Sequence, residues 1–235
     1  MKLIRYMYRI PLTIVLLLLI ISAVIVAKFL GVSMGFRHRM FSAWRSMVLF
    51  TLGINVNVKG EMVRRAGIAM CNHRSYADAI FVYSYAPVVY LAMEELKSWP
   101  IFGLAASAMD TVFVDRSSKE SRRAAKLMLA DRVSQGMSPV VFPEGYCSEK
   151  GLLPFKPGMF HVAAEKGVPI LPLTIEYSDP EMAWVGEESF ISHLTRMLGK
   201  PSWSVDLTFG PAMEGVDGVD LNDRVAAWMS ENIRH

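Results

Sequence analysis

The chain has 235 residues, a length that suits one globular domain plus an additional segment and is short for two full domains. Apolar residues make up 52% of the chain, so we expect part of it to face lipid. Residues 1–65 carry a net charge of +9 and residues 66–235 a net charge of −6, which argues against nucleic acid as a partner and suits attachment to an anionic membrane surface.

The first predicted element is an uncharged apolar helix over residues 10–27. It would be roughly 27 Å long, close to the ~30 Å thickness of a hydrocarbon core. Three interpretations remain open: a helix that spans the membrane, a helix inserted at a shallow angle, and a cleaved signal peptide that follows the basic residues Lys2, Arg5 and Arg9. The run is long for a signal peptide, and Ile25-Val26-Ala27 is a poor cleavage site.

Residues 32–50 form a second predicted helix, in which Arg37 interrupts a mostly apolar side. That side consists of Phe36, Met40, Phe41, Trp44, Met47, Val48 and Phe50. The pattern predicts an interfacial helix with Trp44 at headgroup level, and the alternative is a helix packed on the body of the protein. We therefore divide the chain into a membrane anchor, residues 1–53, and a body, residues 54–235. The greater basic count after the apolar run places the body in the cytoplasm, against the inner membrane.

From residue 54 onward, short β-branched or apolar runs alternate with helical stretches. The predicted strands are Ile54–Val58, Gly67–Cys71, Val88–Ala92, Thr111–Val114, Pro139–Phe142, Ile170–Glu176 and Trp203–Phe209. The predicted helices are Ala77–Tyr85, Ile101–Met109, Lys119–Gln135, Gly158–Glu165, Glu187–Leu198 and Leu221–Ile233. This alternation predicts an α/β fold.

The connection between the second predicted strand and its helix reads Cys-Asn-His-Arg-Ser-Tyr-Ala-Asp over residues 71–78. It contains His73 at a place where α/β proteins tend to have their active sites. Asp78 falls in the first helical turn, from which its carboxylate can reach back to an imidazole nitrogen. Such a pair leaves the other ring nitrogen to accept a proton. Taken alone, the spacing also fits a surface histidine beside an aspartate at a helix start.

Further blocks follow in a fixed order, and together they are far more specific than the histidine and aspartate alone. They are Val-Phe-Val-Asp-Arg at 112–116, Phe-Pro-Glu-Gly at 142–145, Phe-Lys-Pro-Gly at 155–158 and Val-Pro-Ile-Leu-Pro-Leu at 168–173. With Asn72-His73 through Asp78 they make the sequence resemble the glycerolipid acyltransferase family, which includes 1-acylglycerol-3-phosphate acyltransferase. The resemblance covers roughly residues 55–210.

The resemblance implies roles for individual residues. It makes His73 the catalytic base and Asp78 the acid that orients it. Arg116 would help to hold the acceptor's phosphate, Glu144 and Gly145 would belong to the acceptor site, and residues 168–173 would be linked to the acyl donor. We also expect Asn72 and Lys156, beside the first and third blocks, to bind substrate.

The fold that the resemblance implies is the family's α/β fold, a mixed sheet flanked by helices, with a hydrophobic channel for the acyl chain. We expect an O-acyltransferase that needs no cofactor and no acyl-enzyme. It would move a fatty acyl group from acyl-CoA or acyl-carrier protein to a lysolipid at the membrane, giving phosphatidic acid from 1-acylglycerol-3-phosphate.

One departure from the family bears on the acceptor. The third block usually continues Glu-Gly-Thr-Arg-Ser, whereas here Tyr146-Cys147-Ser148 follows and the arginine is absent. Arg116 and Lys156 remain available for a phosphate, whereas Arg122 and Arg123 fit either a phosphate site or a solvated helix face. A lysolipid with another head group, such as lyso-ornithine lipid or a lysophospholipid, is therefore the alternative acceptor.

Other functions are less consistent with the sequence. Gly31-Val32-Ser33-Met34-Gly35 matches the serine hydrolase pattern Gly-x-Ser-x-Gly but lacks the strand that should precede it. Cys71 and Cys147 fit buried thiols in a reducing compartment, and a disulfide between them stays open. We expect no metal site, because His-x3-His and Cys-x2-Cys spacings do not occur. An acyl thioesterase and a non-catalytic lipid-binding protein remain as alternatives.

Overall fold

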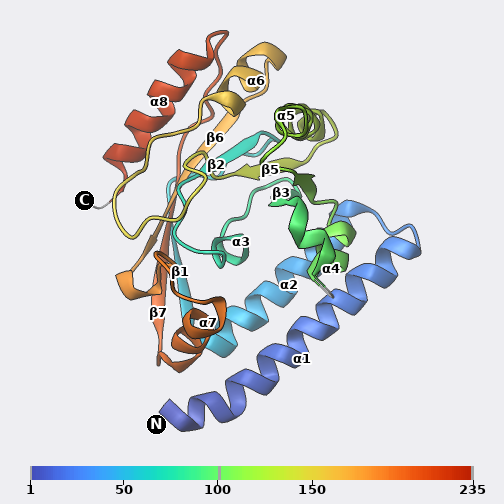
Figure 1. Cartoon of the computed structure of the whole chain (residues 1–235), viewed down its shortest axis with the longest axis vertical. Coiled ribbons are helices and arrows are strands. Elements are labelled where there is room, and N and C mark those ends of the chain that lie inside the picture. Colours follow the sequence, from blue (N-terminus) through green and yellow to red (C-terminus); the bar gives the residue numbers. More distant parts are fainter. Residues whose placement is uncertain (1, 100–101, 234–235) are drawn as a thin grey trace.

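The computed structural model describes residues 2–99 and 102–233, and these fold around one seven-stranded sheet (Figure 1). The strands are β1 (Ile54–Lys59), β2 (Ile68–Cys71), β3 (Val88–Met93), β4 (Val112–Val114), β5 (Ser138–Val141), β6 (Ile170–Tyr177) and β7 (Trp203–Phe209). Their order across the sheet is β1-β7-β6-β2-β5-β3-β4. Neighbouring strands are parallel except for β6 and β7, which are antiparallel. The predicted α/β fold with a mixed sheet is confirmed.

Helices cover both faces of the sheet because its central strands are apolar on both sides. In β2, Ile68 and Met70 belong to one core cluster, and Ala69 and Cys71 belong to a second cluster on the opposite face. The first cluster is completed by α5 (Lys119–Ser134), α6 (Gly158–Lys166) and α8 (Gly218–Glu231). The second is completed by α1 (Lys2–Phe29), α2 (Met34–Leu52), α3 (Asp78–Phe81), α4 (Phe102–Ala108) and α7 (Phe190–Gly199).

The helix that was predicted over Ala77–Tyr85 is the largest error in the element boundaries. The structure has only one turn there, α3, which ends at Val82 in an extended conformation, and the chain is irregular from there to β3. The β-branched and aromatic residues after Phe81 favour extended backbone, and Pro87 disfavours helix at the residue before it. Two 3-10 helices, η1 (Glu94–Ser98) and η2 (Pro180–Met182), were not predicted. Ile101, the predicted start of α4, lies outside the described residues.

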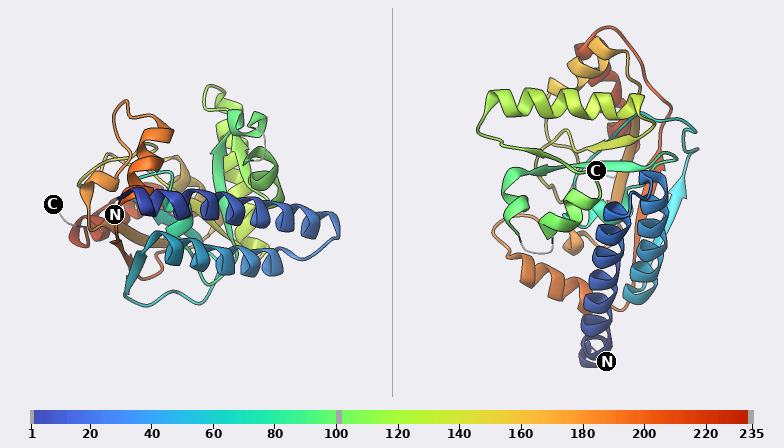
Figure 2. Two further views of the ribbon diagram at one scale, coloured as in Figure 1. Left: turned by 90° about the horizontal axis from the view of Figure 1, so that it is seen from below. Right: turned by 90° about the vertical axis from the view of Figure 1, so that its right-hand side faces the viewer.

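The two N-terminal helices run side by side along the molecule, as Figure 2 shows from two directions. They share a hydrophobic core with the sheet, because Val24 of α1 and Val48 of α2 are each only 2% exposed. Trp44 is buried as well, so the prediction that it lies at headgroup level is wrong and the packed alternative holds for that side of α2. Arg37, which interrupted the apolar side, is buried too and forms an ion pair of 2.7 Å with Asp110.

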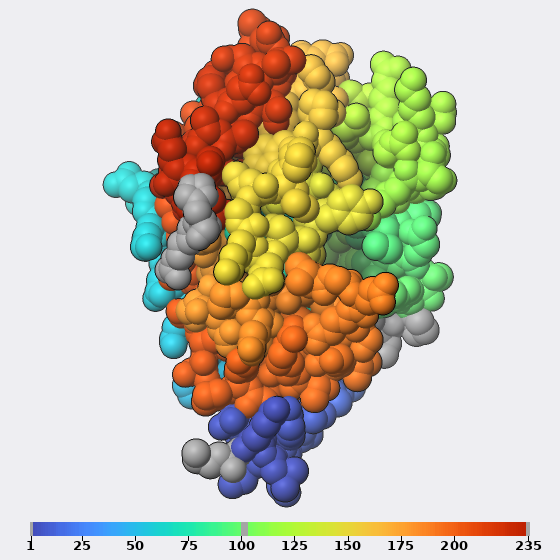
Figure 3. Space-filling view, turned by 60° about the vertical axis from the view of Figure 1, so that its left-hand side comes forward, coloured from blue at the N-terminus to red at the C-terminus, as the bar shows by residue number. Residues whose placement is uncertain are grey.

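The beginning of α1 is attached to the end of α7. Arg9 is buried and donates to the carbonyl oxygens of Leu198 at 3.2 Å and of Pro201 at 3.0 Å. Arg5 donates to the carbonyl oxygen of Gly199 at 2.8 Å. These arginines satisfy carbonyl groups that a helix end leaves without intrahelical partners. Figure 3 shows the result, with the start of α1 in blue directly beneath α7 in orange.

Candidate functional site

His73 and Asp78 meet at the carboxyl edge of the sheet. β2 ends at Cys71, and the chain turns through Asn72 to His73 before α3 begins at Asp78. Nδ1 of His73 lies 2.7 Å from Oδ2 of Asp78, so the predicted contact is confirmed. The imidazole is 20% exposed and the carboxylate is fully buried. Because Nδ1 is occupied, Nε2 is the ring nitrogen left to face a substrate.

The Asp78 carboxylate accepts several hydrogen bonds besides the one from His73. Oδ2 also accepts from the backbone amides of Arg74 at 2.7 Å and Ser75 at 3.0 Å. Oδ1 accepts from the phenol of Tyr177 on β6. These bonds hold the carboxylate in one orientation and give its buried oxygens the hydrogen-bond partners that buried polar atoms need.

The imidazole of His73 is held on its flat face by Phe142, whose ring centroid is 4.0 Å away with an angle of 15° between the planes. Burial opposes protonation of the ring, but hydrogen bonds with Asp78 and Cys147 outweigh burial and raise the pKa of His73 to about 10. His73 therefore carries a proton at neutral pH as long as both partners are in place.

Residues 143–153, here called the site loop, are bonded to the backbone of His73 on both sides. Oε1 of Glu144 accepts from the His73 amide at 2.8 Å, and the Ser148 amide donates to the His73 carbonyl oxygen at 2.9 Å. Oε2 of Glu144 accepts from the Leu153 amide at 2.7 Å. Burial raises the pKa of the Glu144 carboxyl, and the two amide bonds work against that rise. Glu144 is 2% exposed, so its side chain is buried between the rest of the site loop and the backbone of His73, which it helps to position.

Asn72 is fully buried, and its side chain hydrogen-bonds to the backbone of β6. Its side-chain amide donates to the carbonyl oxygen of Ile175 at 2.9 Å, and its oxygen accepts from the Ile175 amide at 2.7 Å. This pairing extends the contact between β2 and β6 by one residue, directly before His73. The structure thus gives Asn72 a positioning place in the site instead of the substrate contact we expected.

Gly145 and Lys156 lie against each other at the surface of the site loop. Gly145 has a φ of 75°, and a Cβ atom there would come within 2.2 Å of Nζ of Lys156. The ammonium group of Lys156 is 4.8 Å from the ring centroid of Tyr146. The positive φ therefore favours glycine here, and the end of the Lys156 side chain lies across the space that a larger residue would fill.

Arg116 follows β4, which lies three strands from β2 at the same edge of the sheet. Adjacent strands are ~4.8 Å apart, so the backbone of Arg116 lies roughly 15 Å from the backbone of His73. Lys126 of α5 reaches the start of α6, since a Cβ at Gly158 would come within 2.6 Å of its Nζ. Exposed Arg116 and Lys156, together with half-buried Lys126, place positive charge around the site loop.

Cys147 is the site residue that sequence reasoning left without a role. It lies in the site loop where the related family has arginine, and its side chain contributes to raising the pKa of the His73 imidazole. The thiol is half-buried, and the Cys147 and Cys71 side chains are both free, so the open possibility of a disulfide is excluded. Sequence could show that the arginine was missing but not that its replacement would influence the pKa of His73.

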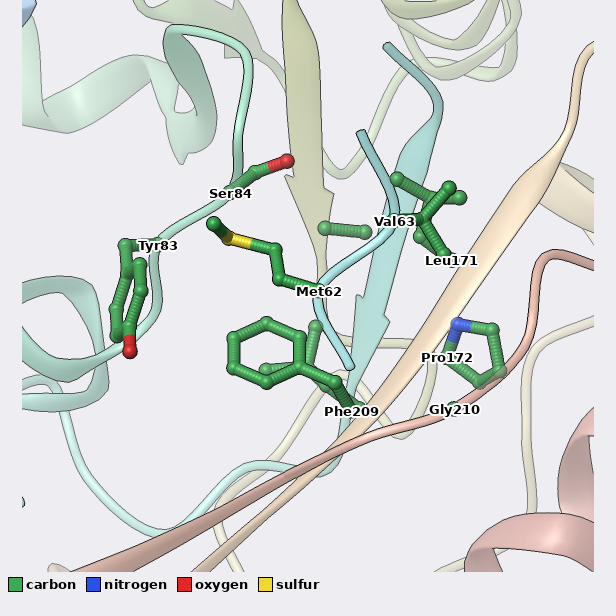
Figure 4. Close-up of a pocket in the computed structure, with 10 residues that line it drawn as sticks. Met62, Val63, Tyr83, Ser84, Leu171, Pro172, Phe209 and Gly210 are labelled. Carbon is green, nitrogen blue, oxygen red and sulfur yellow. The ribbon is translucent and has the colours of Figure 1, made fainter. Parts of the chain in front are cut away.

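The apolar pocket in Figure 4 does not reach the histidine. It lies beside the amino-terminal part of β6, where Met62 extends toward Ser84 and Tyr83 (Figure 4). Its volume is about 10 Å³, room for about one water molecule. A neighbouring cleft of about 500 Å³ is lined by residues 61–64 and 209–211. Neither hollow is the channel beside His73 that the family resemblance led us to expect.

Comparison with known proteins connects this geometry to a reaction. The family model described as Acyltransferase matches residues 55–176, which include His73, Asp78 and the site loop. A lyso-ornithine lipid O-acyltransferase of Rhizobium meliloti is 33% identical over 192 residues, covering 73% of this chain and 65% of that protein. A 1-acyl-sn-glycerol-3-phosphate acyltransferase of Neisseria gonorrhoeae is 28% identical, covering 77% of this chain and 74% of that protein.

A solved structure shows the same fold. The crystal structure of the 1-acyl-sn-glycerophosphate acyltransferase PlsC from Thermotoga maritima superimposes with a TM-score of 0.74 at 21% sequence identity. The match covers 98% of this chain and 94% of that one, so it includes α1 and α2 as well as the sheet.

Proposed function

The chain belongs to the acyltransferase family, and on that premise we propose that it transfers a fatty acyl group from an acyl thioester to the hydroxyl of a lysolipid, with His73 as the base. The observation that carries this proposal is the bond from Nδ1 of His73 to the buried, fully hydrogen-bonded carboxylate of Asp78. This arrangement fixes the tautomer of the ring and presents Nε2 to a hydroxyl.

In the simplest mechanism, Nε2 removes the proton of the lysolipid hydroxyl while its oxygen attacks the thioester carbonyl. The donor's thiol then leaves with a proton from the imidazolium. His73 must be neutral for the first step. Asp78 and Cys147 are the groups that raise the His73 pKa, so an acceptor that separates Cys147 from the ring would bring the ring toward its basic form.

For the acceptor we propose 1-acylglycerol-3-phosphate, supported by the positive charge of Arg116, Lys126 and Lys156 around the site loop. Arginine and lysine are the usual partners of phosphate groups. The donor is acyl-CoA or an acyl-carrier protein, whose thioesters present the same reacting group.

A lyso-ornithine lipid is the second candidate acceptor, and one observation favours it. The arginine that would bind a phosphate in the third family block is replaced by Cys147, which is uncharged as a thiol and cannot pair with a phosphate as arginine does. Four of the curated relatives, between 26% and 33% identical, are named as enzymes for that lipid. Its head group would offer a carboxylate to the same lysines.

Both candidate acceptors are membrane lipids, and α1 provides a means of attaching the protein to the membrane. By length and composition it is a candidate membrane span. Its two ends both lie against the body of the protein, at α7 through Arg9 and at Asp110 through Lys28, a bond of 2.8 Å. A helix held in this way lies along the domain, so we propose that its exposed apolar side chains enter one leaflet, with the body on the cytoplasmic side of the inner membrane.

The test is an acyl-transfer assay with the full chain in detergent, labelled palmitoyl-CoA, and 1-acylglycerol-3-phosphate, lyso-ornithine lipid and lysophosphatidylcholine offered separately. Labelled phosphatidic acid supports the leading acceptor, and labelled ornithine lipid alone supports the second. Labelled free fatty acid as the sole product would identify a thioesterase. If palmitoyl-CoA gives no turnover, palmitoyl-carrier protein takes its place, and failure with both donors contradicts the proposed function.

A further inference from the structure

Arg74 directly follows His73, and its guanidinium is buried against the inner side of the site loop. The residue is only 2% exposed. Nη1 donates to the carbonyl oxygens of Ser148 at 3.2 Å and Gly151 at 3.0 Å, and to the hydroxyl of Ser148. Removing a cation from water is costly unless it finds such acceptors. All three acceptors belong to the site loop, so a single nitrogen bonds the loop to the residue beside the histidine.

The charge of Arg74 acts on two carboxylates. Nη2 lies 3.9 Å from Oε1 of Glu176 on β6, and among the described residues it has no hydrogen-bond partner. The Ser148 hydroxyl, which accepts from Nη1, donates to Oε2 of Glu144 at 3.4 Å. Burial raises the pKa of the Glu144 carboxyl, and the charge of Arg74 works against that rise. The guanidinium thus favours the ionised carboxylate, the form that can accept both of its amide bonds.

The main chain of Arg74 is fixed independently of the site loop. Its amide donates to Oδ2 of Asp78 at 2.7 Å, and its carbonyl oxygen accepts from the Trp184 amide at 2.8 Å. The backbone therefore stays beside His73 and Asp78, while the side chain reaches the loop. An arginine attached in this way connects the position of the loop to the position of the histidine.

The burial of Arg74 decides how it can contribute to the reaction. The related family usually has an arginine where Cys147 stands, and Arg74 brings a guanidinium to the next residue, Ser148. With 2% of its surface exposed, it is out of reach of an acceptor's head group. We propose that Arg74 is a positioning residue for acyl transfer, which holds the site loop, and with it the Glu144 carboxylate, against the backbone of His73. This inference rests on the proposed function for the reaction that it serves.

The first experiment measures hydrogen–deuterium exchange of the full chain in detergent by mass spectrometry. In Arg74→Met, peptides that contain the amides of Ser148 and Leu153 should exchange roughly tenfold faster than in the wild type, because the loop opens locally more often. Arg37→Met is the matched control, since Arg37 is another buried arginine that binds a carbonyl oxygen and a carboxylate, but on α2. Its site loop should exchange as in the wild type.

The second experiment measures acyl transfer from palmitoyl-CoA to the preferred lysolipid. In Arg74→Met the kcat should fall by roughly tenfold to a hundredfold, the effect of a misplaced catalytic group, while KM for the lysolipid stays within about twofold. Arg74→Lys should recover part of the lost kcat, because its ammonium keeps the charge and three donors. Arg37→Met should keep the wild-type kcat at temperatures where it is folded.

A double variant tests whether Arg74 acts through the site loop. Arg74→Met combined with Glu144→Gln should lower kcat by less than the product of the two single effects, because both residues hold the same loop to the same histidine. Two independent structural defects would instead multiply. If Arg74→Met does not fold, Arg74→Lys serves in the same comparisons, with smaller changes in the same directions.

The outcomes separate this inference from the proposed function. Wild-type exchange of the site loop together with wild-type kcat in folded Arg74→Met would overturn the inference and leave the proposed function standing. A KM that rises as much as kcat falls would show a contact with substrate and contradict a positioning role, as would effects that multiply in the double variant. Absence of turnover in the wild type would contradict the proposed function, and the exchange measurement would still decide whether Arg74 holds the loop.

Discussion

The phenol of Tyr177 donates to Oδ1 of Asp78, so the carboxylate that orients His73 is itself held from β6, at a sequence distance of 99 residues. Both side chains are buried, with Asp78 fully inaccessible and Tyr177 only 7% exposed. The same strand binds Asn72 through the main chain of Ile175. The segment that contains His73 is thus fixed to β6 at two points.

Replacing Tyr177 with phenylalanine removes this bond and leaves Oδ1 of Asp78 without a donor. Stability should fall by about 1–3 kcal/mol, the usual effect of an unpaired buried acceptor. Turnover should fall with little change in KM, since the hydroxyl acts on Asp78 and not on substrate. Steady-state kinetics and thermal unfolding measure the two effects. Tyr90→Phe is the matched control, because that buried phenol donates to the carbonyl oxygen of Ala79 at 2.7 Å and should affect stability alone.

The ion pair between Arg37 and Asp110 connects α2 to the end of α4. The Arg37 side chain is 8% exposed, and besides the carboxylate it binds the carbonyl oxygen of Ala108. Removing one member of a buried pair typically costs about 3–5 kcal/mol. We therefore expect Arg37→Met to lower the free energy of unfolding by an amount near the lower end of that range, since Asp110 is 21% exposed. Exposed Arg39, two residues away, is the control, and Arg39→Ala should unfold like the wild type.

The dependence of stability on pH follows from the raised pKa of His73. Its ordinary value is 6.5 and its folded value is about 10, so its protonated form stabilises the fold fully below pH 6.5. That contribution is lost as the pH rises through about 10. Between pH 7 and pH 10 the unfolding free energy of the wild type should fall more than that of His73→Gln, by on the order of a few kcal/mol. Parallel urea titrations of the two proteins measure the difference, and equal slopes against pH would contradict the charged pair with Asp78.

The basic residues around the site loop should govern the affinity for the acceptor. If Arg116 or Lys156 binds its phosphate, alanine at that position should raise KM for 1-acylglycerol-3-phosphate by roughly tenfold to a hundredfold, the effect of losing a bond to a charged group. The kcat should change much less. Arg132→Ala, at the far end of α5, is the matched control because Arg132 binds Gln135 on its own helix. An unchanged KM in both site variants would favour an acceptor held in another way.

Much of the fold could be predicted because the information is local. β7 has the predicted bounds, β2 begins one residue later than predicted, and β5 is shifted by one residue at both ends, since buried apolar runs and flanking loops mark such strands. The contact of His73 with Asp78 followed from the strand-to-helix turn alone. The short α3 was missed because apolar residues at 79–83 fit a helix and an extended segment equally well.

The remainder of the site depends on contacts between distant segments. No residue next to Tyr177 in the sequence indicates that its hydroxyl bonds to Asp78. Asn72 and Glu144 become buried only when β6 and the site loop pack around His73. Arg37 is a further case, since its charge on an apolar helix side is explained only by Asp110. Such residues are recognisable in sequence as exceptions to a pattern, but their partners are not.

The most direct test of the account is the turnover of His73→Gln with the preferred lysolipid and palmitoyl-CoA, measured beside the wild type and His161→Gln. Glutamine keeps the polarity and much of the size of histidine but accepts no proton at neutral pH. His161 is an exposed residue of α6, outside the site. The account predicts that His73→Gln loses activity by roughly 10²–10⁴-fold, the usual contribution of a positioned base, while His161→Gln matches the wild type. Wild-type turnover in correctly folded His73→Gln would contradict the central claim that His73 is the base for acyl transfer.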